Sequence, residues 1–71
     1  MSSYANWLAQ RASSANAMEL HQQILPCGRR MVREYSALLQ DSSRAHLHPL
    51  IRSRLIELEN TLSQLGGAQA A

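Results

Sequence analysis

Residues 49–67, PLIRSRLIELENTLSQLGG, carry the most regular apolar repeat in the chain. Steps of four and three positions alternate along its large apolar residues, which are Ile51, Leu55, Leu58, Leu62 and Leu65. Because one helical turn takes about 3.6 residues, these side chains share one stripe of a helix. Pro49 suits the first turn of that helix, and Gly66-Gly67 suits its end. We therefore predict a helix over 49–65 and a frayed tail over 66–71.

A second apolar stripe precedes this helix. Its members again recur every three or four positions: Leu20, Ile24, Cys27, Met31, Tyr35 and Leu38. Asn16 can accept a hydrogen bond from an amide of the first helical turn, and Glu19 stands at the third helical position of a capping-box pattern. The sequence therefore predicts a helix over 16–40.

Pro26 and Gly28 lie inside this second stripe. An interior proline costs a helix about 3 kcal/mol and a glycine about 1 kcal/mol. One interpretation is a single helix that is kinked or briefly interrupted near Pro26; the other is a break into pieces over 16–25 and 28–40. We favour the first, because the stripe keeps its phase across the proline.

The two stripes are joined by a polar segment that predicts a loop over 41–48, since Asp and Ser side chains compete for backbone hydrogen bonds. Two apolar stripes with a short connection predict an antiparallel helical hairpin. Ser3 can cap a short helix over 3–11, which carries Trp7. The composition is rich in Leu and Ala and contains no Phe. We therefore predict one all-α domain over 1–71.

A chain of 71 residues buries only about 60% of its unfolded surface, and its single cysteine cannot form an internal disulfide. Two helices also leave part of each stripe uncovered. We therefore expect a partner-binding surface of apolar residues, drawn from Trp7, Leu25, Val32, Leu39, Leu50 and Ile56. Trp7 and Tyr4 fit two roles equally well, because aromatic side chains either anchor a partner or fix the short helix to the hairpin.

Seven arginines and no lysine stand against five acidic residues, which gives a formal charge of +2. Arg29, Arg30 and Arg33 can contact phosphate, together with Arg52 and Arg54. The alternative is a solvated outer helix face. The charge excess is small for a nucleic-acid binder and no aromatic residue interleaves the arginines, so we expect nucleic-acid contact to be unlikely.

Chemistry-bearing motifs are scarce. His46 and His48, with His21 and Cys27, are residue types that bind zinc, but their spacing matches no zinc pattern. The sequence has no glycine-rich phosphate loop and no nucleophile motif, so we expect neither an enzyme nor a bound metal or cofactor. No apolar run approaches the ~18 residues that span a bilayer and no signal peptide opens the chain, so we expect a soluble cytoplasmic protein.

The segment from Glu19 to Leu65 resembles the small bacterial co-chaperones of type III secretion needle subunits. The likeness rests on the chain length, the two-stripe hairpin, Cys27-Gly28-Arg29-Arg30-Met31 within the first long helix and Leu62-Ser63-Gln64-Leu65 near the end of the second. It implies a cytosolic protein that sits against a helical-repeat chaperone and helps to keep the needle subunit from polymerising. A shorter stretch, His46 to Ile56, resembles part of the theta subunit of bacterial DNA polymerase III, which implies a helical accessory protein.

Together these observations predict a non-catalytic adaptor or co-chaperone that presents an apolar hairpin face to another helical protein. Two alternatives stay open. The first is a small accessory or regulatory protein of nucleic-acid metabolism, and the second is a self-assembling helical oligomer.

Overall fold

Every regular element in residues 3–70, the part of the chain described by this computed structural model, is a helix. Side chains are described for residues 3–66. The elements follow in the order α1 (Tyr4–Ser13), α2 (Ala17–Glu19), the π-helix η1 (Leu20–Ile24), α3 (Leu25–Leu39), the 3-10 helix η2 (Ser42–Leu47) and α4 (His48–Ala70). The prediction of an all-α fold, with a helical hairpin and a short N-terminal helix, is confirmed.

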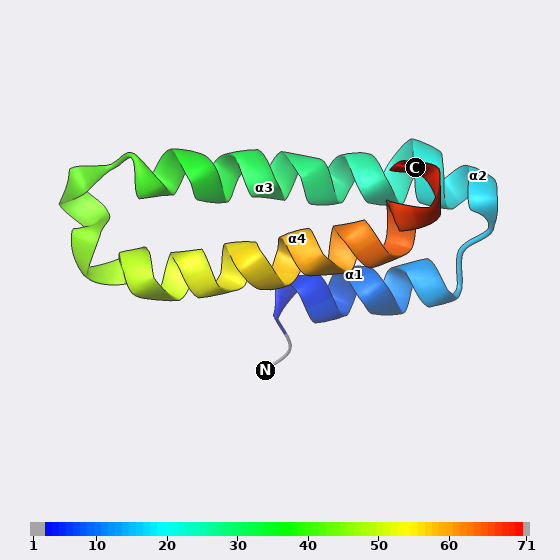
Figure 1. Cartoon of the computed structure of the whole chain (residues 1–71), viewed down its shortest axis with the longest axis horizontal. Coiled ribbons are helices and arrows are strands. Elements are labelled where there is room, and N and C mark those ends of the chain that lie inside the picture. The colour runs from blue at the N-terminus through cyan, green and yellow to red at the C-terminus, as the bar shows by residue number, and fades with distance from the viewer. Residues whose placement is uncertain (1–2, 71) are drawn as a thin grey trace.

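The helices α3 and α4 form the hairpin and run in opposite directions (Figure 1). Helix α1 lies along α4 and runs in the same direction as α4, so it is antiparallel to α3 (Figure 1). The molecule measures 40 × 28 × 17 Å. Helix α1 also reaches α3, since Tyr4 Oη lies 2.9 Å from Cys27 Sγ, so the three helices share one core.

The first helix begins as the sequence predicts and ends later. The Ser3 side chain accepts a hydrogen bond from the amide of Asn6 at 3.2 Å. The helix continues to Ser13, two residues beyond the predicted end at Arg11. The hydroxyls of Ser13 and Ser14 donate to the carbonyls of Gln10 and Arg11, which satisfies acceptors that the end of a helix leaves free.

Pro26 is accommodated by a change of hydrogen-bond pattern directly before it. In η1 the amide of Leu25 donates to the carbonyl of Leu20, five residues back, instead of four. The wider π turn makes room for the proline ring, which would otherwise crowd the carbonyl four residues before it. Ile24 and Leu25 keep right-handed helical backbone angles, so the helix passes through this point. The alternative of two pieces over 16–25 and 28–40 is wrong.

The connection predicted as a loop over 41–48 contains a helical segment. Asp41 accepts a hydrogen bond from the amide of Ser43 at 3.0 Å and so starts η2. Within η2, the backbone departs from helical geometry only at Arg44, with φ −110° and ψ 22°. His48 Nε2 lies 3.2 Å from the Leu38 carbonyl and 3.1 Å from the Asp41 carbonyl. This ring therefore caps the end of α3 while His48 itself begins α4, one residue before the predicted start.

The predicted glycine stop at Gly66-Gly67 is wrong, because α4 continues to Ala70. A glycine that ends a helix normally adopts a positive φ, and no glycine among the described residues does so. A Cβ placed on Gly66 would lie 3.5 Å from Leu25 Cδ1, so Gly66 is a packing position against α3. Residues 66–70 are therefore helical instead of forming the predicted tail, and Ala71 lies outside the described residues.

The core sits where α1, η1 and α4 meet. Leu8 and Leu58 are completely buried at its centre, with Ala5 and Ile24 beside them. Leu58 was predicted in the hairpin seam, and its burial agrees with that prediction. Leu8 shows that the core is not made by the hairpin alone, because α1 supplies its other central side chain.

Gly28 allows the helices to approach closely in this core. A Cβ added there would lie 2.6 Å from Leu62 Cδ2 and 2.8 Å from Leu8 Cδ2, distances that real Cβ atoms almost never show. The residue that appeared in the sequence only as a weak point of the helix therefore gives α1 and α4 access to the backbone of α3.

Candidate functional site

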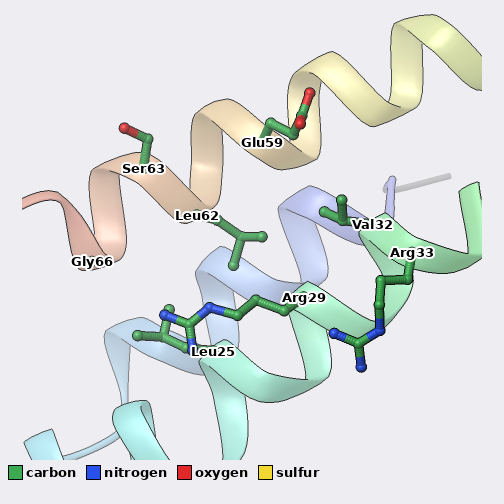
Figure 2. A pocket seen from close by; sticks show the side chains of 8 residues that line it. All are labelled: Leu25, Arg29, Val32, Arg33, Glu59, Leu62, Ser63 and Gly66. Atoms are coloured by element: carbon green, nitrogen blue, oxygen red, sulfur yellow. The ribbon is translucent and has the colours of Figure 1, made fainter. Parts of the chain in front are cut away.

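A surface groove of about 540 Å³ runs between α3 and α4. Figure 2 shows the side chains that line it, which come only from these two helices. They are Leu25, Arg29, Val32 and Arg33 of α3 and Glu59, Leu62, Ser63 and Gly66 of α4. Helix α1 contributes no lining residue, so the groove remains open although the hairpin already carries one docked helix.

Helical spacing explains why these residues gather. Arg29 lies four positions after Leu25 and three or four before Val32 and Arg33 along α3. Along α4, Leu62 and Ser63 lie three or four positions after Glu59 and four or three before Gly66. Leu25 is only 2% exposed and, with the partly buried Val32 and Leu62, gives the groove an apolar floor. Gly66 has no side chain to fill the space beside Leu25.

The two edges of the groove carry opposite charge. Arg29 and Arg33 are exposed on the α3 edge, and Glu59 is exposed on the α4 edge. Both arginine side chains extend away from Glu59 (Figure 2). The ion pairs found within residues 3–66 lie elsewhere and join Arg11 to Glu19 at 4.0 Å, Arg44 to Asp41 at 3.2 Å and Arg54 to Glu57 at 3.8 Å. No carboxylate of the described chain therefore neutralises the basic edge.

The predicted partner-binding residues fall into two groups. Leu25 is buried, which corrects its assignment to an exposed surface, because α4 covers it at Gly66. It nevertheless lines the groove with Val32, so these two predicted residues come together with Arg29 and Arg33. The remaining predicted residues lie outside the groove: Leu39 is partly buried, whereas Trp7, Leu50 and Ile56 are 46%, 55% and 59% exposed.

The α4 side of the groove was not predicted as a site. Leu62 was recognised only as a member of the apolar seam, while Glu59, Ser63 and Gly66 were not singled out as binding residues. A signal was present, because Leu62 and Ser63 each lie three or four positions from both Glu59 and Gly66 on one helix. The sequence does not indicate that this stripe faces the stripe of Arg29 and Arg33, since that depends on how α3 and α4 pack.

The two aromatic residues of α1 have different roles. Tyr4 Oη lies 2.9 Å from Cys27 Sγ and 3.4 Å from the Cys27 carbonyl, so it ties α1 to α3. Burial, followed by the hydrogen bond with Cys27, raises the pKa of Tyr4 to about 12. The ring of Trp7 stands 5.4 Å from that of Tyr4 at an interplanar angle of 40° and remains about half exposed. Tyr4 therefore helps to fix α1 to α3, whereas Trp7 keeps about half of its surface accessible to solvent.

The histidines do not form a metal site within the described residues. His48 is engaged with the carbonyl of Leu38 in α3 and with that of Asp41 in the connection, and His46 is exposed on η2. Across residues 3–66, no three His, Cys, Asp or Glu side chains come close enough together to hold a metal ion. The arrangement that the structure does offer is the groove, with an apolar floor and charged edges.

The chain matches no protein-family model, no curated protein and no solved structure. Among residues 3–70, no helix combines the length and the apolar character required to cross a membrane.

Proposed function

We propose that this chain is a non-catalytic adaptor that binds a helix of another protein in the groove between α3 and α4. The observation that carries the proposal is the apolar floor formed by Leu25, Val32 and Leu62 between polar edges. Grooves between two helices commonly receive the apolar face of a third helix, whose anchor residues recur every three or four positions. In this groove the floor would supply the apolar contact, and the polar edges would interact with water when no partner is bound.

A volume of about 540 Å³ suits a few large side chains and is much smaller than a folded domain. The occupant is therefore a single strip of side chains, such as Leu or Ile, from one helix. A co-chaperone that accompanies a secretion needle subunit is the specific form of this proposal that the sequence resemblance suggests, since such a protein works by covering helical surface of its partners.

The test uses a synthetic amphipathic peptide of about 20 residues, with leucines every three or four positions and uncharged glutamine flanks. We expect saturable shifts of the amide NMR signals of Val32, Ser63 and Gly66 when this peptide is added to the full chain. The substitution Ser63→Phe places a ring in the groove from an exposed position, and we expect it to weaken binding by about tenfold or more.

The matched control is Ser53→Phe, which adds the same ring to another exposed position of α4 that does not line the groove. It should leave the peptide affinity unchanged. Failure of the uncharged peptide to bind, or equal weakening by both substitutions, would show that the groove is not a helix-binding site.

A second candidate is a nucleic-acid accessory protein, favoured by one observation: Arg29, Arg30 and Arg33 are all exposed on α3. This candidate predicts binding of duplex DNA that weakens steeply with salt and is lost when all three arginines are replaced by alanine. Absence of DNA binding at low salt would remove it.

A further inference from the structure

We infer that the occupant of the α3–α4 groove is an acidic amphipathic helix of a different protein, whose carboxylates pair with Arg29 and Arg33. This inference rests on the function proposed above and specifies the chemistry of the partner. The partner helix would place apolar anchors over Leu25, Val32 and Leu62 and would direct a pair of acidic residues, three or four positions apart, toward α3.

The basic edge is the first reason. Arg29 and Arg33 are four positions apart, so their side chains leave the same face of α3 about one turn from each other. Both are exposed and border the groove, and neither takes part in an ion pair within residues 3–66. Guanidinium groups favour carboxylates because they can donate two parallel hydrogen bonds. Two such groups in line match two carboxylates on one face of an opposing helix.

A second copy of this chain does not offer that match. Its acidic residues are Glu19, Glu34, Asp41, Glu57 and Glu59, and no two of them are three or four positions apart. Glu57 is already engaged, since it accepts a hydrogen bond from Ser3 and pairs with Arg54. A copy could offer single carboxylates such as Glu34 or Glu59, but no two that are spaced by one helical turn. The unmatched charge therefore points to a partner with a different sequence.

The floor of the groove also distinguishes a helix from a nucleic acid. A phosphodiester backbone would pair with Arg29 and Arg33 but would leave Leu25, Val32 and Leu62 facing a charged, hydrated chain. Leucine or isoleucine side chains of an amphipathic helix remove the same apolar surface from water, which is favourable. An apolar floor beside a basic edge thus fits an acidic helix better than it fits DNA or RNA.

The test compares three synthetic peptides that share one leucine stripe and carry glutamate, lysine or glutamine on the flank that would face α3. Affinities are measured by NMR titration of the full chain at low and moderate salt. We expect the glutamate peptide to bind roughly five- to thirtyfold more tightly than the lysine peptide, with a preference that shrinks as salt rises. The shifted amides should again be those of Val32, Ser63 and Gly66.

A charge exchange gives the decisive variant. The double substitution of Arg29→Glu and Arg33→Glu should invert the preference so that the lysine peptide binds more tightly, and replacing both by Gln should abolish the preference. Arg30→Glu is the matched control on the same helix, because Arg30 is exposed but does not line the groove. It should retain the order of affinities within about twofold. Circular dichroism of each variant establishes that the fold is intact.

Several results would overturn the inference while leaving the proposed function standing. These are equal affinity for the glutamate and lysine peptides, a preference that survives the double charge reversal, or shifts centred on Leu50 or Ile56 instead of the groove. Duplex DNA that binds more tightly than the glutamate peptide and shifts the same amide signals would overturn it in favour of a nucleic acid. If neither the glutamate peptide nor the uncharged peptide binds, the proposed function itself falls.

Discussion

The two glycines that face side chains across the hairpin should respond to alanine with opposite changes in stability. A new methyl group at Gly28 would meet Leu62 Cδ2 at 2.6 Å, Leu8 Cδ2 at 2.8 Å and Leu62 Cγ at 3.3 Å. Leu8 is completely buried and cannot easily move aside. At Gly66 the same methyl group would meet Leu25 Cδ1 at 3.5 Å, an ordinary van der Waals contact.

The magnitudes follow from two opposing effects. Alanine in place of glycine inside a helix stabilises it by about 0.5–1 kcal/mol, and this gain applies to both positions. Overpacking a core costs about 1–3 kcal/mol, and this cost applies only to Gly28. We therefore expect Gly28→Ala to lower the free energy of unfolding by about 1 kcal/mol and Gly66→Ala to raise it by up to about 1 kcal/mol.

Urea and thermal unfolding followed by circular dichroism measure this difference. For a domain of this size, each kcal/mol changes the melting temperature by about 4–8 °C, so the two variants should be clearly separated. Equal m-values would show that the compactness of the unfolded state is unchanged. Equal stabilisation by both alanines would refute the close approach of α1 and α4 to Gly28 and, with it, the three-helix core.

Three further predictions concern single side chains. Leu58→Ala should lower the free energy of unfolding by about 2–5 kcal/mol. The exposed control Leu50→Ala should change it by less than about 0.5 kcal/mol. Equal losses of stability in urea unfolding would contradict the placement of Leu58 in the core. Tyr4→Phe should cost about 0.5–1.5 kcal/mol through loss of the hydrogen bond with Cys27. The pKa of Tyr4 in the folded protein is about 12, above the ordinary tyrosine value of 10.0. This part of the stability is therefore present below pH 10.0 and lost as pH rises through 12, which ultraviolet titration of tyrosine against Tyr4→Phe would detect. Hydrogen bonds from Ser43 lower the pKa of Asp41 below 3.8, so the cap that Asp41 provides at η2 stabilises the fold above pH 3.8 and is lost as pH falls further. Asp41→Asn should therefore reduce the fall of the melting temperature at acid pH. An unchanged fall would contradict the role of the cap.

The apolar periodicity was enough to predict the two long helices and their pairing, because burial of a stripe depends mainly on spacing within one helix. The caps at Ser3 and Asn16 were predicted from the residue types, because a capping side chain acts within one turn. The roles of Gly28 and Gly66 could not be predicted in this way. From the sequence, each glycine was interpreted by its local backbone preference alone. Its role depends instead on which side chains of other helices lie against it.

The same reasoning explains what was missed at the candidate site. Arg29 and Arg33 stood out as exposed charges, and Leu25 and Val32 as surplus apolar residues, yet nothing in the sequence joined them to Glu59 and Ser63. A groove is defined by the rotation of two helices about their own axes, and several rotations are compatible with the same apolar stripes. Leu25 is an example: the rotation of α3 about its own axis determines whether this residue is buried in the floor of the groove or exposed on the surface.

The position of the groove relative to the core favours it, over the exposed apolar residues at the turn of the hairpin, as the proposed binding surface. Leu62 and Leu25 line the groove and also pack against glycines of the opposite helix, Leu62 against Gly28 and Leu25 beside Gly66. Leu47 and Leu50 are more exposed, but they lie at the turn of the hairpin beside the short 3-10 helix. A binding site on rigid, well-packed helices loses less conformational entropy on association than one on a short connection. Since this small chain concentrates its packing at the end where α1 docks, a partner helix gains most where that packing already holds the floor of the groove in place.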